Sequence, residues 1–119
     1  MKQEIREVID ISNAEMYSWG DNCSGWHLVK REDLSIIQEK VPPGKSEKQH
    51  YHKRGRQFFF ILKGKAVIEI EGKKYYLNSN QGISIEPGKN HKFYNESEKY
   101  VIFLVITVPK IFGDRVDIE

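Results

Sequence analysis

The chain has 119 residues, of which 39% are hydrophobic and 30% are charged, and its formal net charge is +2. This length and composition are ordinary for one globular domain and argue against intrinsic disorder. Lysine and glutamate are interleaved along the chain instead of forming a basic block, so the charge pattern argues against a nucleic-acid surface.

Three further features bound the class of protein. The longest apolar run, Val101 to Val108, is far too short to span a membrane as a helix and is typical of a buried strand. The N-terminal residues MKQEIREVID include acidic side chains and have no apolar core, so we expect no signal peptide. A single cysteine, Cys23, excludes an internal disulfide. These features favour a cytoplasmic protein without a membrane partner.

The N-terminal part is predicted to be an arm over residues 1–25, with a strand near Val8 to Ile11. Two tryptophans, two glycines and the cysteine then crowd into the segment YSWGDNCSGW, from Tyr17 to Trp26. That density is unusual for a plain loop.

A hairpin is predicted next, with strands from Trp26 to Arg31 and from Leu34 to Val41 and a turn at residues 31–33. Pro42 and Pro43 end this pairing, because proline has no N–H to donate to a sheet.

Short strands and turns continue over the rest of the chain. We expect strands at residues 57–63, 66–70, 75–77, 83–85, 91–94 and 100–108. A total of nine or ten short strands with no convincing amphipathic helix indicates an all-β sandwich or barrel. The expected organisation is one domain over residues 1–119, with a barrel at 26–108 and a C-terminal tail at 109–119.

Two histidines and a glutamine have spacings that a metal ion can use. His50 and His52 are separated by one residue, so both side chains project to the same face of an extended strand. After a turn, Gln57 returns on the next strand, and His91 is a fourth candidate far downstream. Such neutral donors suit a divalent transition metal that keeps open coordination positions, and zinc, nickel, manganese, iron and cobalt all accept them.

The alternative is that these histidines are surface or core residues that are hydrogen-bonded in place. Gln57 has a second interpretation as well, because its amide can orient a bound water or ligand instead of binding the metal directly. His27 lies outside this pattern and is interpreted as a satisfied polar residue.

Two motifs resemble those of the cupins. The first is G-x5-H-x-H-x4-Q-x6-G, from Gly44 to Gly64, and the second is P-G-x-x-H-x3-N, from Pro87 to Asn95. The chain departs from the usual pattern twice, because Gln57 replaces the common glutamate ligand and Glu86 stands where proline is frequent.

The resemblance implies a fold and a range of functions. The fold is a double-stranded β-helix, or jelly-roll barrel, made of two packed antiparallel sheets. The function it implies is that of a metal-dependent isomerase, lyase or dioxygenase acting on a sugar, a sugar acid or a related oxo compound. The alternatives are a non-catalytic cupin that binds or senses a small molecule, and a protein whose metal is structural.

Glutamine at the third ligand position resembles that of cupins that linearise unsaturated uronates. Those enzymes carry an acidic residue on the last long strand, whereas here residues 101–106 contain none, which weighs against that activity. Weak candidates for acid–base work are Tyr94, Tyr100 and Cys23, each with an ordinary packing role as the favoured alternative.

The remaining side chains have simpler interpretations. Trp19 and Trp26 are expected to close the barrel mouth or to pack at a dimer interface. Lys53, Arg54 and Arg56 are interpreted as solvated. A homodimer is expected because residues 57–63 form an aromatic strand that is apolar on both faces, so that Phe58, Phe60 and Leu62 need a cover on the outside.

Overall fold

The computed structural model describes residues 8–110 and 112–118, and within them it contains strands and turns but no helix. No helix in this part of the chain is therefore available to cross a membrane. The strands are β1 (Glu15–Trp19), β2 (Cys23–Lys30), β3 (Ser35–Val41), β4 (His50–His52), β5 (Arg56–Lys63), β6 (Ala66–Ile70), β7 (Lys73–Leu77), β8 (Gly82–Ile85), β9 (His91–Tyr94), β10 (Val101–Val108) and β11 (Arg115–Asp117).

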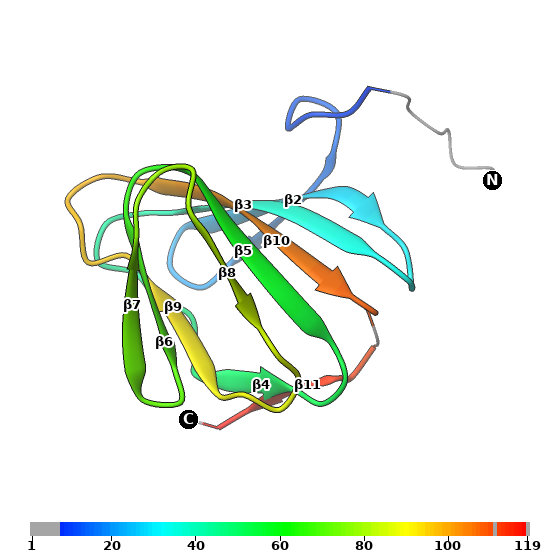
Figure 1. The fold of residues 1–119 in the computed structure, drawn as a ribbon. Coiled ribbons are helices and arrows are strands. Elements are labelled where there is room, and N and C mark those ends of the chain that lie inside the picture. The colour runs from blue at the N-terminus through cyan, green and yellow to red at the C-terminus, as the bar shows by residue number, and fades with distance from the viewer. Residues whose placement is uncertain (1–7, 111, 119) are drawn as a thin grey trace.

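The strands form two antiparallel sheets that face each other across the core (Figure 1). The six-stranded sheet has the order β1-β2-β3-β10-β5-β8, and the five-stranded sheet has the order β11-β4-β9-β6-β7. The chain crosses from one sheet to the other between β3 and β4 and crosses back between β4 and β5, so consecutive strands often lie in different sheets. This winding is that of a double-stranded β-helix and confirms the all-β jelly-roll prediction.

The strand expected near Val8 to Ile11 is wrong. The Asp10 carboxylate accepts a hydrogen bond from the Ser12 N–H (2.8 Å), and the Asp10 carbonyl accepts one from the Ala14 N–H (2.9 Å). These local bonds make a turn, and the first strand begins only at Glu15.

The dense segment that follows forms a hairpin, in which β1 pairs with β2 around a turn at residues 20–22. Gly20 and Asn22 both have positive φ angles, of 52° and 62°, which these two residue types tolerate in tight turns. The predicted hairpin between Trp26 and Val41 is also present, with β2 paired to β3.

The two sheets extend beyond residues 26–108 at both ends. β1 and the first part of β2 belong to the six-stranded sheet, and β11, in the expected tail, pairs with β4. The tail therefore borders the strand that carries His50 and His52.

The core lies between the sheets and is largely aromatic. Phe93 and Phe103 stack with ring centroids 4.1 Å apart, and Phe59 packs 6.0 Å from Phe93. The edge of Phe59 also faces the ring of His91 at 6.2 Å. The aromatic stack therefore fills the barrel interior next to the histidines.

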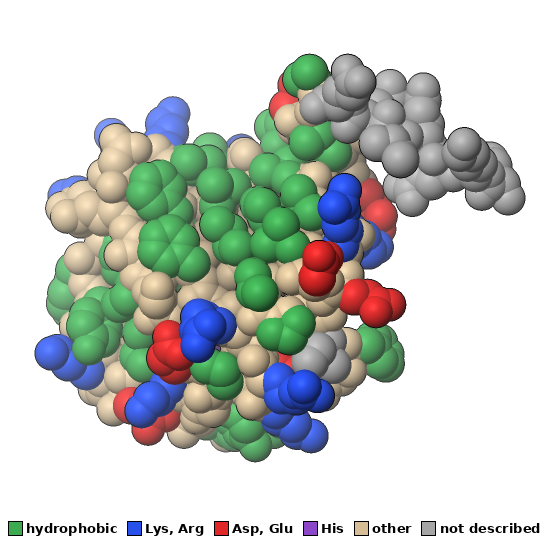
Figure 2. Space-filling model, turned by 45° about the vertical axis from the view of Figure 1, so that its right-hand side comes forward, with side chains coloured by type: hydrophobic (Ala, Val, Ile, Leu, Met, Phe, Trp, Pro, Cys, Tyr) green, Lys and Arg blue, Asp and Glu red, His purple; other side chains and the backbone are tan. Residues whose placement is uncertain are grey.

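Hydrophobic side chains also gather on the outside of the molecule, over the six-stranded sheet (Figure 2). Along β5, Phe59 and Ile61 point into the core, whereas Phe58 and Leu62 remain exposed and Phe60 is half-buried. The sequence prediction that this strand is apolar on both faces is confirmed.

Candidate metal centre

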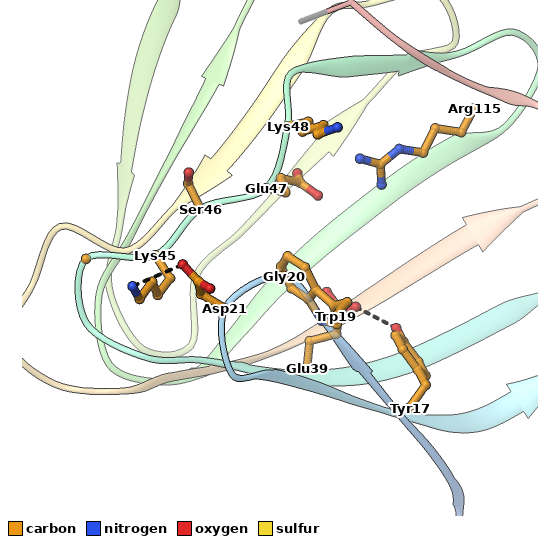
Figure 3. A pocket seen from close by; sticks show the side chains of 11 residues that line it. Tyr17, Trp19, Gly20, Asp21, Glu39, Lys45, Ser46, Glu47, Lys48 and Arg115 are labelled. Atoms are coloured by element: carbon orange, nitrogen blue, oxygen red, sulfur yellow. Dashed lines mark hydrogen bonds and ion pairs between the residues drawn. The ribbon is translucent and has the colours of Figure 1, made fainter.

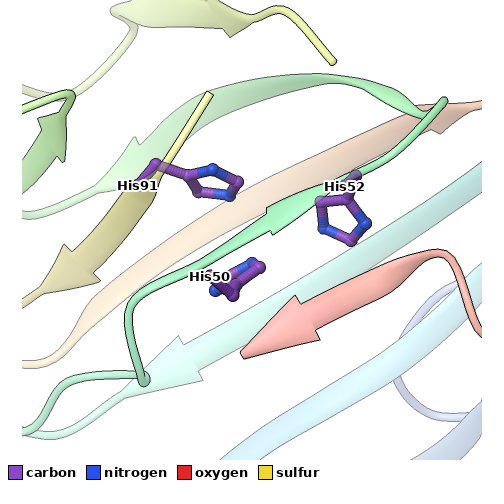
Figure 4. A group of neighbouring side chains, drawn as sticks. All are labelled: His50, His52 and His91. Carbon is purple, nitrogen blue, oxygen red and sulfur yellow. The ribbon is translucent and has the colours of Figure 1, made fainter. Parts of the chain in front are cut away.

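The three histidines of the two sequence motifs converge inside the barrel (Figure 4). His50 and His52 project inward from the same face of β4, and His50 lies opposite His91 of β9 in the antiparallel register. One nitrogen from each ring lies within 4.8 Å of those of the other two. All three side chains are buried, with exposed fractions of 2%, 9% and 1% for His50, His52 and His91.

Backbone carbonyls fix the orientation of two of the rings. His50 Nδ1 lies 2.8 Å from the Lys48 carbonyl, and His91 Nδ1 lies 3.0 Å from the Lys89 carbonyl. A carbonyl only accepts, so in both neutral rings Nδ1 carries the proton. The Nε2 lone pairs then face the centre of the cluster, as metal ligands require.

His52 is held differently. Its Nδ1 lies 3.7 Å from Asp114 Oδ2, and its Nε2 is buried without a hydrogen-bond partner. A buried nitrogen without a partner costs free energy, and a metal ion would relieve that cost.

Gln57 reaches the same place from β5. Its amide Nε2 donates to Thr107 Oγ1 (3.1 Å), and its Oε1 lies 3.1 Å from His91 Nε2. With the His91 proton on Nδ1, both of these facing atoms are acceptors. Their lone pairs therefore face each other instead of forming a hydrogen bond.

Burial keeps the cluster neutral. It lowers the pKa of His50 to about 3 and that of His52 to about 4, and it also lowers the pKa of His91. Repulsion from a protonated His91 ring would also lower the pKa of His50 and that of His52. All three imidazoles therefore have their lone pairs free at neutral pH, which is the state that binds metal.

Asp114 fixes the turn that joins the histidine strand to the glutamine strand. Its carboxylate accepts hydrogen bonds from the Arg54 and Gly55 N–H groups, both at 2.9 Å, and its carbonyl accepts one from Lys53 (3.0 Å). Gly55 allows this approach, because a Cβ there would lie 3.1 Å from Asp114 Oδ2 and 3.2 Å from the Pro109 carbonyl oxygen.

A cavity of about 290 Å³ adjoins the histidines, and sequence reasoning missed several of the residues that line it. The missed ones include Glu39 from β3, Glu47 from the segment before β4, and Arg115 from β11. These residue types are common at any surface, so the sequence offers no local signal for them. The sequence comparison considered a carboxylate on the last long strand and did not consider one on β3.

The three weak catalytic candidates lie away from this cavity. Tyr94 follows inward-facing Phe93 on β9 and so points outward, toward Lys74. Tyr100 is 50% exposed and lies under the Lys40 ammonium group, beside a separate surface hollow. Cys23 is buried in the hydrophobic core, and burial raises its pKa, so it fits the small-hydrophobe alternative.

The remaining sequence interpretations agree with the structure only in part. Trp19 packs on the core and lines a hollow at the barrel mouth, whereas Trp26 is half-buried, with neighbours on β2 that face the core. Arg56 forms an exposed ion pair with Glu86 at 3.0 Å, as expected for a solvated side chain. His27 is not satisfied as expected, because its Nδ1 is buried without a hydrogen-bond partner.

The match to a family model decides the class. Residues 37–107 match the model of the cupin domain, and this range contains both histidine motifs. The chain belongs to the cupin family.

Two other proteins are similar in sequence to this chain. An uncharacterized protein from Aquifex aeolicus is 34% identical over 89 residues, which cover 74% of this chain and 73% of that protein. The polyketide synthase CurC of Streptomyces cyaneus is 29% identical over 80 residues, which cover 65% of this cupin and 52% of CurC. The cupin spans about half of the length of CurC.

Solved structures share the fold over most of the chain. A double-stranded β-helix protein from Klebsiella pneumoniae superposes with a TM-score of 0.80 at 18% identity and covers 97% of this chain and 99% of its own. A sugar phosphate isomerase of the cupin superfamily from Silicibacter pomeroyi superposes with a TM-score of 0.74 at 17% identity, covering 85% of this chain and 74% of its own.

Proposed function

We propose that this cupin binds one divalent transition metal through His50, His52, His91 and Gln57, and that it is a metal-dependent enzyme acting on a small polar metabolite. The observation that carries the proposal is the unpartnered, buried Nε2 of His52 beside two rings whose lone pairs face the same point. Zinc, nickel, manganese, iron and cobalt all fit a set of imidazoles and an amide.

The metal would act as a Lewis acid that polarises a carbonyl or hydroxyl oxygen. The protein residues supply the rest. The buried rings present neutral lone pairs, and Gln57 is oriented by its hydrogen bond to Thr107. The neighbouring cavity of about 290 Å³ has room for only a small molecule.

A sugar, a sugar acid or a related oxo compound is the substrate class that we favour, with isomerase, lyase or dioxygenase chemistry. A structural neighbour named as a sugar phosphate isomerase supports this class. The cavity also contains carboxylates from β3 and the segment before β4, which offsets the absence of one on β10. Acid–base groups beside the histidines favour an enzyme over a binding module.

We also propose a homodimer that pairs through the outside of the six-stranded sheet. Exposed Phe58 and Leu62 and half-buried Phe60 form an apolar strand there, beside the edge strand β8. A second copy would bury this surface.

The test begins with elemental analysis of protein purified without added metal, followed by loading with each candidate metal. Loaded protein is then incubated with hydroxyketones, aldoses, uronates and 2-oxo acids, and substrate loss is followed by proton NMR. We expect one equivalent of metal and consumption of at least one compound, with both lost in His52→Ala.

Two results would contradict the proposal in different ways. If the wild-type protein binds no metal, the site itself is wrong. If metal binds and a compound raises the melting temperature without being converted, the protein is a ligand-binding cupin and not an enzyme.

A further inference from the structure

Two carboxylates, Glu39 and Glu47, stand between the histidine cluster and a larger hollow at the barrel mouth. Both line the cavity of about 290 Å³ that contains His52, whose buried Nε2 has no partner. Both also line the mouth hollow of about 710 Å³, together with Trp19 and Arg115 (Figure 3). A ligand that enters from the mouth therefore meets the carboxylates before it reaches the histidines.

Glu39 is held in place across three strands. Tyr17 of β1 lies opposite Gly25 of β2, and Gly25 lies opposite Glu39 of β3. The Tyr17 ring occupies the space over Gly25, where a Cβ would lie only 2.3 Å from the ring, and its hydroxyl donates to Glu39 Oε2 at 2.6 Å. The missing side chain at Gly25 is what allows this bond.

Glu47 is held by the main chain of β9. Its N–H donates to the Phe93 carbonyl (3.1 Å), and the Phe93 N–H donates back to Glu47 Oε1 (3.1 Å). Arg115 of β11 points toward it from the opposite wall of the hollow (Figure 3). Each carboxylate thus has a fixed position, as a ligand-binding group requires.

The two groups lie in a setting that disfavours negative charge. Burial raises the pKa of Glu47 to about 8, with a further contribution from Glu39, and burial raises the pKa of Glu39 to about 7 despite its bond to Tyr17. At neutral pH both can therefore carry a proton and donate a hydrogen bond to a ligand oxygen.

We propose that Glu39 and Glu47 are ligand-facing groups that hydrogen-bond the hydroxyl or carbonyl oxygens of the substrate. This inference rests on the proposed metal site. Arg115 lines both hollows beside the two carboxyl groups.

The test uses cobalt-loaded protein, whose visible absorption reports ligands that reach the metal. Dihydroxyacetone serves as the neutral hydroxyketone, and its dissociation constant is measured for wild type, Glu47→Ala, Glu39→Ala and Glu96→Ala. Glu96 is an exposed carboxylate that lines neither hollow and is the matched control. Cobalt stoichiometry checks that each variant is folded.

We expect Glu47→Ala and Glu39→Ala each to bind dihydroxyacetone about tenfold more weakly than wild type, because each variant loses one hydrogen bond to the ligand. Glu96→Ala should match wild type within about twofold.

A dihydroxyacetone affinity that neither Glu47→Ala nor Glu39→Ala changes by more than about twofold would overturn this inference while leaving the metal site intact. A wild-type protein that binds no cobalt would overturn both.

Discussion

His50 on β4 and His91 on β9 lie directly opposite each other in the antiparallel register, with ring centroids 4.2 Å apart. This cross-strand pair joins the two sequence motifs, since the first contributes one ring and the second contributes the other. His52, two residues along β4, adds a third ring on the same face. The geometry of the candidate metal centre follows from this pairing.

Removal of a histidine from this cluster should abolish tight metal binding. We expect His52→Ala to lower metal affinity by more than the roughly 10- to 100-fold that loss of an outer-shell partner costs, because it removes a direct ligand. Isothermal titration with zinc or nickel measures this effect. His27→Ala is the matched control, since it removes the one histidine outside both motifs, and an equal loss there would contradict the assignment.

Gln57→Glu should destabilise the metal-free protein but not the metal-bound protein. Without metal, a buried carboxylate replaces a hydrogen-bonded amide, and we expect a loss of about 1–3 kcal/mol in the free energy of unfolding. With metal, the carboxylate is a stronger ligand, so the loss should be recovered. Denaturant unfolding in chelator and in excess zinc compares the two states. Equal destabilisation in both would argue that Gln57 does not bind the ion.

Asp114→Ala should weaken metal binding, although Asp114 is not itself a proposed ligand. The carboxylate holds the N–H groups of Arg54 and Gly55 in the turn between His52 and Gln57, so its loss releases both ligands. We expect roughly a 10-fold loss of affinity by isothermal titration. Asp117→Ala removes a nearby exposed carboxylate that pairs with Arg115, and it should leave the affinity unchanged.

The pH dependence of the stability of the metal-free protein should report the raised pKa of Glu47. Its pKa rises on folding from 4.5 to about 8, chiefly through burial, so its contribution to stability is complete below pH 4.5 and is lost as the pH rises toward 8. Glutamine mimics the protonated form and does not titrate. The melting temperature of Glu47→Gln relative to wild type should therefore increase by roughly 5 °C between pH 5 and pH 8. A difference that is flat with pH would mean that the Glu47 pKa is not raised.

The apolar strand β5 offers a test of the dimer. Light scattering after gel filtration should give twice the mass of the 14.0 kDa chain. Phe58→Asp places a charge in the proposed interface and should give the monomer mass, because a buried charge without a partner is costly. Tyr76→Asp, at a side chain of β7 that is 67% exposed, is the control and should remain dimeric. A monomeric wild-type protein would rule the interface out.

The order of residues was enough to predict the fold class and the three histidines. Alternation along the strands is a local property, so it indicated an all-β chain, and the spacing of His50 and His52 put both rings on one face without knowledge of any partner. The two motifs then pointed to His91 and Gln57. The strand expected at residues 8–11 failed for an equally local reason, because Asp10 forms a turn there.

Only the tertiary structure decided what surrounds the histidines. Glu39, Glu47, Asp114 and Arg115 come from four separate segments, and each is a residue type that usually faces solvent. Only Asp114 is buried, whereas Glu39 and Glu47 are half-buried and Arg115 is exposed. The four residues meet because strands pair across distant parts of the chain, as in the line from Tyr17 over Gly25 to Glu39. Spacing along a sequence fixes which face a side chain takes, but the approach of distant strands fixes which side chains share a cavity, and that depends on the packing of the whole barrel.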